Sequence, residues 1–275
     1  MRFQSKSSVL YMFRNFGQLF FVTLPVSVLL AFFAGPRLET DLFVMLVSGQ
    51  INADNFFQAF SNSFTVLRFV QQHWWVLLVV LFAVVLLAYT MCVMVVKIDR
   101  HMRMGNMLSL PLKRAFGIFP MMLLYVGGWV VVSEVAMLII VGVVYMLSFL
   151  PSAEAIVAIG FSLTVLVRAL VSYFFCLLII TFPLKYSENY RFNVAMSYSA
   201  RTMAPKRGKL ILLSFVYPFG RCAAMALGYF ARPLDVLVFT VAFFFVLTYL
   251  PCFAFKQYYD EVGGERRDVS QIMFG

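Results

Sequence analysis

Three ionisable residues lie inside long apolar stretches of the sequence: Glu134, Arg168 and Arg221. Charged groups are costly in a hydrocarbon environment, so those found there usually face the inside of a bundle, where they pair or contact a ligand. Guanidinium groups match the geometry of carboxylates and phosphates. The three residues therefore predict a substrate-binding site for an anionic group, with Arg168 and Arg221 as ligands and Glu134 as counter-charge or proton carrier.

The spacing of Glu134 and Arg168 places them at one depth. Each lies 17 residues from Pro151, which marks the turn of a predicted helical hairpin. Because antiparallel helices rise equally per residue, the two side chains reach the same level and are able to pair. A purely structural alternative follows, in which they only neutralise one another inside the bundle.

Arg221 follows Pro218 and Gly220 in another apolar stretch. Proline removes a helical donor and frees a carbonyl, so we expect a kink beside this cation. Broken helices of this kind line binding sites in transporters. In the structural alternative, the long side chain of Arg221 instead reaches toward the outer membrane surface.

Residues for catalysis are scarce. Asp99, Arg100 and His101 form the one acid and base grouping near a predicted membrane surface, and an enzyme acting on lipids would use Asp99 and His101. Hydrolysis or group transfer needs more convergent polar groups than these, and no nucleophile elbow, phosphate loop or zinc-protease pattern occurs. We interpret Asp99 as a local charge partner of Arg100 and Arg103, and we expect no catalytic residue.

The four cysteines point to packing rather than chemistry. All lie inside apolar segments and none forms a C-x-x-C pair. Small apolar packing residues behave in this way, whereas metal sites and disulfide frameworks show characteristic spacings. We therefore expect no metal site and no cofactor.

The composition requires a lipid environment. Of 275 residues, 63% are hydrophobic and 12% charged, about half the charged fraction of a soluble domain. A helix needs roughly 20 apolar residues to cross a bilayer, and runs such as Val76 to Val96 lack the polar alternation of membrane strands. The candidate spans are 16–34, 74–96, 117–149, 156–184, 209–230 and 234–255. The sequence thus predicts an all-α, polytopic membrane bundle of about six transmembrane helices.

The first of these spans is expected to stay in the mature protein. It follows basic residues, as a secretory signal does, but a signal peptidase site requires small residues in an A-x-A-like pattern. Phe32 occupies a position where that pattern needs a small residue. We therefore interpret 16–34 as a retained helix.

Lys and Arg residues gather in alternate connections. Most of the 22 lie in the N-terminal arm, in 97–116, in 185–209 and in the tail after 255. Basic loops remain on the cytoplasmic side of a membrane, so both termini are predicted to be cytoplasmic in a plasma (inner) membrane. The net charge of +10 does not indicate nucleic-acid binding, because the cations flank membrane spans.

Two segments, 105–116 and 189–203, are too short and polar to span but carry apolar residues at helical spacing, such as Phe192, Ala195 and Met196. They are predicted to be amphipathic helices at the cytoplasmic membrane surface, the second ending at Pro205 and Gly208. Cations in and near them are expected to contact anionic lipid headgroups: Arg103, Lys113, Arg114, Arg201, Lys206, Arg207 and Lys209.

The organisation predicted is one integral membrane domain, 1–275, built from hairpin units at approximately 1–96, 97–184 and 185–275. Their similar lengths are compatible with a threefold repeat or with chance. The connection 35–73 is the longest predicted on the outer side, and we expect a short surface helix or a partial lid there. Trp74 and Trp75 mark the membrane surface where the next span begins.

Short motifs resemble a family of bacterial six-helix membrane proteins that includes the membrane domain preceding the catalytic domain in some glycerophosphodiester phosphodiesterases. The likeness covers about 90–265 and lies in these segments: Gly105 to Pro120, Phe182-Pro183-Leu184, Asn193 to Ala200 with Lys209, and Tyr258-Tyr259-Asp260-Glu261. In the fused enzymes the hydrolase activity belongs to a soluble domain. The resemblance therefore implies a non-enzymatic bundle that works with the membrane or with partners.

These observations favour a non-enzymatic membrane protein that moves or accommodates an anionic lipid or small solute. Its expected partners are the bilayer, anionic lipids above all, and a membrane protein or a second copy of the chain. The alternative is a structural or assembly subunit of a larger membrane complex, docked through the basic loops and the tail 256–275.

Overall fold

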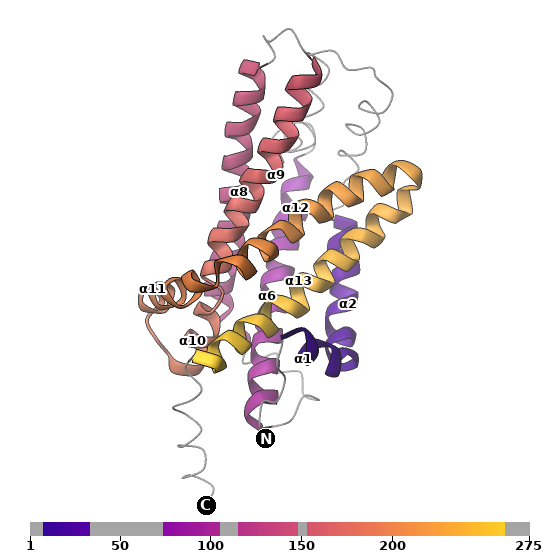
Figure 1. The fold of residues 1–275 in the computed structure, drawn as a ribbon. Coiled ribbons are helices and arrows are strands. Elements are labelled where there is room, and N and C mark those ends of the chain that lie inside the picture. Colours follow the sequence, from indigo (N-terminus) through magenta and orange to yellow (C-terminus); the bar gives the residue numbers. More distant parts are fainter. Residues whose placement is uncertain (1–7, 34–73, 105–114, 148–152, 262–275) are drawn as a thin grey trace, which may run out of the picture.

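The computed structural model describes residues 8–33, 74–104, 115–147 and 153–261 (Figure 1). Within these ranges the chain is helical apart from short turns, and it contains no strand. Helices satisfy their backbone hydrogen bonds internally, as a chain surrounded by lipid must. The predicted all-α bundle is confirmed.

Six long helices in the described ranges coincide with the six predicted spans: α2 (Phe16–Phe33), α6 (Trp75–Met104), α8 (Phe119–Leu147), α9 (Ala153–Leu177), α12 (Arg207–Phe230) and α13 (Arg232–Glu261). Each forms where the sequence is almost continuously apolar. Pro25, Pro218 and Pro251 lie inside α2, α12 and α13 without ending them.

Four spans of the described chain are long and apolar enough to cross a membrane: Leu77–His101, Phe119–Met146, Ala158–Glu188 and Val236–Tyr259. The third includes α10 (Thr181–Glu188), which follows α9. Helix α1 (Ser8–Arg14) and α2 make a fifth if this pair, bent by 89°, is one span. The chain is thus a multi-pass membrane protein, and a sixth crossing by α12 stays a prediction.

The helices pack as a ring. Each long helix contacts the next in chain order, from α2 through α6, α8, α9 and α12 to α13. Helix α13 then packs against α2 and also against α6. Figure 1 shows the yellow α13 beside the indigo α2. The ring therefore closes only when the last helix meets the first.

The connecting elements gather at one end of this ring, which we call the basic end. Figure 1 shows α1, the last turns of α6, α10, α11 (Phe192–Met203), the start of α12 and the end of α13 there. The cations with described side chains at this end are Arg14, Lys97, Arg100, Lys185, Arg191, Arg201, Lys206, Arg207, Lys209 and Lys256. The grouping of cations that the charge distribution predicts is present in the described chain.

The helix predicted over 189–203 forms as α11, after Asn189 adopts a left-handed conformation and ends α10. Of the apolar residues named for it, Ala195 is buried, Met196 half-buried and Phe192 exposed, and the position of this helix at a membrane surface stays a prediction. Ser199, one turn from Ala195, is also fully buried. The short 3₁₀ helix η1 (Ala204–Lys206), which contains Pro205, then follows α11, so the predicted end is confirmed.

Ser199 is buried because it bonds to a break between α9 and α10. Its hydroxyl donates to the carbonyl oxygen of Leu177 at 2.8 Å and accepts from the backbone N–H of Ile180 at 3.1 Å. Backbone groups freed where a helix is interrupted must find partners when they are buried. The side chain of Ser199, on α11, is the partner of two such backbone groups.

Some sequence predictions lie outside the described residues. These are the lid or surface helix over 35–73, most of the interfacial helix over 105–116, and the end of the tail over 262–275. Trp74 and Trp75 are described, and both are exposed at the start of α6.

We expect Ser199→Ala to lower the stability of the detergent-solubilised protein by about 1–3 kcal/mol, because a buried carbonyl and a buried N–H lose their partner. Thermal unfolding, followed by circular dichroism, measures the loss. Ser197→Ala is the matched control, since Ser197 is exposed and bonds only to Asn193 within α11. Equal melting temperatures for the two variants would contradict this role of Ser199.

Candidate binding cavity

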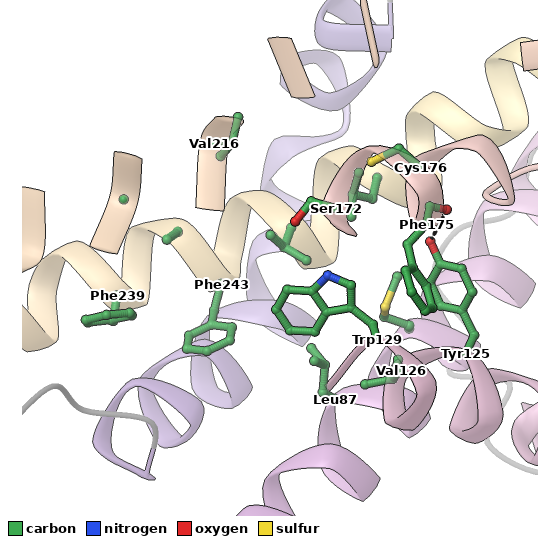
Figure 2. Close-up of a pocket in the computed structure, with 15 residues that line it drawn as sticks. Leu87, Tyr125, Val126, Trp129, Ser172, Phe175, Cys176, Val216, Phe239 and Phe243 are labelled. Carbon is green, nitrogen blue, oxygen red and sulfur yellow. Dashed lines mark hydrogen bonds between the residues drawn. The ribbon is translucent and has the colours of Figure 1, made fainter. Parts of the chain in front are cut away.

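A cavity of about 120 Å³ lies inside the ring, between α6, α8, α9, α12 and α13 (Figure 2). Its walls are almost entirely apolar. The lining residues are Leu87, Met91, Tyr125, Val126, Trp129, Ser172, Phe175, Cys176, Val216, Gly220, Phe239, Ala242, Phe243, Val246 and Leu250. The cavity is therefore built by segments that are far apart in the sequence.

Helix α13 gives the cavity its length. Its lining residues recur on one helical face from Phe239 to Leu250, a distance of about 16 Å at the rise of an α-helix. Helix α6 contributes only Leu87 and Met91, which are one turn apart. The cavity thus follows α13 and has a Phe239 end and a Leu250 end.

Gly220 marks the level at which α12 meets α13 beside the cavity. A β-carbon placed on Gly220 would lie 3.6 Å from the β-carbon of Ala242, an ordinary contact distance, so the two helices touch there. Position 220 on α12 is therefore level with position 242 on α13. Because these helices are antiparallel, Cys222 is level with Thr240, next to the Phe239 end.

Two hydroxyl groups lie at the walls. The hydroxyl of Tyr125 donates to the carbonyl oxygen of Phe175 at 2.7 Å. The side chain of Ser172 is 8% exposed, and its hydroxyl has no hydrogen-bond partner among the described residues. An unsatisfied buried hydroxyl costs about 1–3 kcal/mol. Ser172 is thus a place where a polar group of a ligand would be stabilised.

Arg168 lies one helical turn from Ser172 on α9, so the two share a face of that helix. It is 6% exposed. Its guanidinium group is close enough to Cys222 of α12 for an electrostatic interaction. Arg168 is not among the residues that line the cavity, but Ser172 is. Since Cys222 is level with the Phe239 end, the predicted anion ligand Arg168 lies next to the cavity on that side.

Glu134 is half-buried on α8 at the depth that the hairpin spacing predicts. The reference point is Gly128, where an added β-carbon would touch the ring of Phe175 at 3.8 Å. Glu134 is six residues after Gly128 on α8, and Ala169 is six residues before Phe175 on α9. Because the two helices are antiparallel, Glu134 is level with Ala169, the neighbour of Arg168. The structure therefore brings Glu134 and Arg168 to one level.

Arg221 is the third predicted site residue. Its backbone lies in α12 next to Cys222, and its side chain lies outside the described atoms. Helix α12 continues through Pro218 and Gly220 as one helix, so the span is not broken there. Arg221 follows Gly220 and precedes Cys222, the residue that interacts electrostatically with Arg168, so its backbone lies in the same part of α12.

A second cluster of polar side chains holds the basic end together. Asp99 of α6 is 4% exposed and accepts hydrogen bonds from the Ser187 hydroxyl at 3.1 Å and from the Tyr259 hydroxyl at 3.5 Å. Glu188 of α10 accepts a hydrogen bond from the hydroxyl of Tyr258. Asp99 therefore connects α6 with α10 and α13, a role that the interpretation as a partner of Arg100 and Arg103 missed.

The first two helices join the same cluster. The ammonium group of Lys97, on α6, donates to the carbonyl oxygen of Gln18 on α2 at 3.1 Å. The hydroxyl of Tyr11, on α1, lies 2.7 Å from Nδ1 of His101. Asp99 thus bonds to α10 and α13, whereas His101 bonds to α1. The two residues predicted as an acid and base grouping therefore hold elements of the fold together.

The cations predicted to contact lipid headgroups differ in their exposure. Arg201, Arg207 and Lys209 are exposed. Lys206 is half-buried, and its ammonium group donates to Oε1 of Gln257 at 2.6 Å, so it braces α13. The side chain of Arg103 and the whole of Lys113 and Arg114 lie outside the described part. No group of three potential metal ligands occurs among the described residues.

We expect Asp99→Ala to destabilise the protein by about 1–3 kcal/mol, because the hydroxyl groups that it binds lose a buried acceptor. Tyr259→Phe removes the longer of the two hydrogen bonds described above and leaves that of Ser187, so it should cost less. Midpoints of thermal unfolding in detergent rank the two variants. If Asp99→Ala unfolded at the wild-type temperature, the structural role of Asp99 would be wrong.

Comparison with protein-family models, with curated proteins and with solved structures finds no match for this chain. The resemblance to the membrane domains described above therefore stays a prediction.

Proposed function

We propose that this protein binds an anionic lipid or small anionic solute inside its helical bundle and moves or accommodates it in the plasma (inner) membrane, without catalysing a reaction on it. One observation carries the proposal. A buried cation, Arg168, lies next to an apolar cavity, one turn from Ser172, which lines the cavity and whose hydroxyl has no partner among the described residues. An anionic amphiphile likewise has a charged end followed by an apolar body.

The charge rather than the apolar wall would select the ligand. Lipid tails are as apolar as the cavity, so within a membrane apolar contact gives little preference. A guanidinium group in a medium of low dielectric constant attracts an anion far more strongly than it does in water. The discrimination between ligands therefore rests on Arg168.

The proposed roles of Arg221 and Glu134 follow from their depth along the helices. Arg221, in the helix that packs on α9, is proposed as a second anion ligand. Glu134, at the depth of Arg168, is proposed as the counter-charge or proton carrier when no ligand is bound. A single buried charge without compensation would be expensive to keep.

The basic end is proposed to face the cytoplasm together with both termini, as basic connections generally do. Its exposed cations, Arg201, Arg207 and Lys209, would then contact anionic headgroups, each contributing about 1 kcal/mol. This arrangement would hold anionic lipids close to the bundle.

The alternative proposal, an assembly subunit of a larger membrane complex or a homo-oligomer, is favoured by α8. In its most apolar stretch only 17% of the residues are buried, against 33% to 44% in the other spans of the described chain. Large side chains such as Leu124, Val131 and Ile139 therefore face outward. A partner helix packed on α8 would cover them, as lipid also would.

Native mass spectrometry of the full chain, extracted gently from its own membranes, tests these proposals. We expect a stoichiometric anionic lipid or metabolite on the wild-type protein. Arg168→Gln should reduce its occupancy about tenfold or more, because a hydrogen bond to a charged group is worth about 1.5–3 kcal/mol. A co-purifying protein would instead favour the assembly subunit.

Arg191→Gln is the matched control, since Arg191 is exposed, directly precedes α11 and does not line the cavity. Circular dichroism and melting temperature establish that both variants fold. Equal retention of the anion by the two folded variants would overturn the assignment of Arg168.

A further inference from the structure

We infer that the ligand is a single-chain anionic amphiphile, such as a carboxylic acid with a chain of about six carbons, with its charged end at Arg168 and Ser172 and its chain along α13 toward Leu250. This inference rests on the proposed function and adds to it the class of ligand and its direction in the cavity. Three features of the cavity carry it: its size, its unequal ends and the hydroxyl of Ser172.

The size of the cavity fits one short chain. Its volume of about 120 Å³ is similar to that of an engineered apolar cavity of about 150 Å³ that holds one benzene molecule, so it has room for about six carbon atoms. This volume follows α13 for about 16 Å at the rise of a helix, so the cavity is narrow. The two chains of a diacyl lipid would not fit side by side.

The ends of the cavity differ in polarity. The Phe239 end is level with Cys222, which interacts electrostatically with the guanidinium group of Arg168. The opposite end is lined by apolar side chains such as Met91 and Leu250 and by Tyr125, whose hydroxyl already bonds to the carbonyl oxygen of Phe175, so its lining residues carry no charge. A charged group would be stabilised at the first end and destabilised at the second. The chain of the ligand therefore points toward the basic end.

Ser172 links the charged and apolar parts. Its hydroxyl lines the cavity, is buried and lacks a partner among the described residues, so it is available to donate to a carboxylate or phosphate oxygen. Arg168, one turn away, is placed to contact the same anion. Figure 2 shows the indole ring of Trp129 beside Ser172. The first carbons of the bound chain would pass this ring.

Trp129 also provides the measurement. The chain has three tryptophans, and the other two, Trp74 and Trp75, are exposed at the start of α6. The variant Trp74→Phe with Trp75→Phe leaves Trp129 as the single fluorophore. Bromine atoms in a bound chain quench tryptophan fluorescence at short range, so quenching reports a chain inside the cavity.

The purified full chain in non-brominated detergent is titrated with a carboxylic acid of about six carbons that is brominated within its chain. Its methyl ester and a diacyl phosphatidylglycerol with brominated chains are titrated in parallel. We expect the acid to quench at concentrations at least about tenfold below the ester, since the ester lacks the charge that strengthens the hydrogen bonds. Equal quenching by the ester would overturn the anionic class, and quenching by the diacyl lipid alone would overturn the single chain.

Two hydroxyl deletions on α9 locate the charged end. Ser172→Ala should weaken quenching by the acid about tenfold, the value of one charge-assisted hydrogen bond. Thr164→Ala is the matched control, because Thr164 is also buried on α9 but bonds to its own helix at Gly160 and does not line the cavity. Equal affinities for the two variants would overturn the role of Ser172.

The position of the bromine tests direction. Because Trp129 lies beside Ser172, bromine near the carboxylate should quench more strongly than bromine near the methyl end, and the opposite order would overturn the orientation. Native mass spectrometry separates this inference from the proposed function. If anion retention requires Arg168 but the brominated acid leaves Trp129 unquenched, the inference fails alone; if retention is also independent of Arg168, both fail.

Discussion

Helix α13 packs against α2 through aromatic rings. The ring of Phe244 meets those of Phe16 and Phe20 edge-on, with centroids 5.7 and 5.8 Å apart, a geometry that aromatic pairs prefer. The hydroxyl of Thr248 points to the sulfur of Met12 at 3.5 Å, one turn further along. These contacts join helices from opposite ends of the chain. Without them the ring would be open, and the cavity would lose the helix that forms its longest wall.

The same helix is held again at the basic end. Beyond the cavity wall, Gln257, Tyr258 and Tyr259 bond to Lys206, Glu188 and Asp99, which belong to three different elements. Polar networks in surroundings of low dielectric constant are strong when every group is satisfied and costly when one is not. The position of helix α13 is thus constrained twice, by its aromatic packing on α2 and by the hydrogen bonds near its end. That position determines the width of the cavity.

The sequence was sufficient for the elements and for part of the site. Continuous apolar runs located the six long helices, Pro205 located the end of α11, and hairpin spacing placed Glu134 and Arg168 at one depth. Ser172 and Trp129 were not predicted, because a serine or a tryptophan in an apolar helix resembles any packing residue. The partners of Asp99 lie on α10 and α13, and no local pattern shows that these elements meet. Such information exists only after the ring has closed.

Because α13 closes the ring, the order of synthesis determines when the cavity is completed. Membrane helices insert individually and then associate, and chains emerge from the N-terminus onward. Before α13 arrives, α6, α8, α9 and α12 have all been made, yet the wall from Phe239 to Leu250 is missing. Asp99 and Glu188 meanwhile lack Tyr259 and Tyr258. The cavity is therefore completed in one late step, and a nascent chain arrested before α13 would expose the interior of the bundle to lipid.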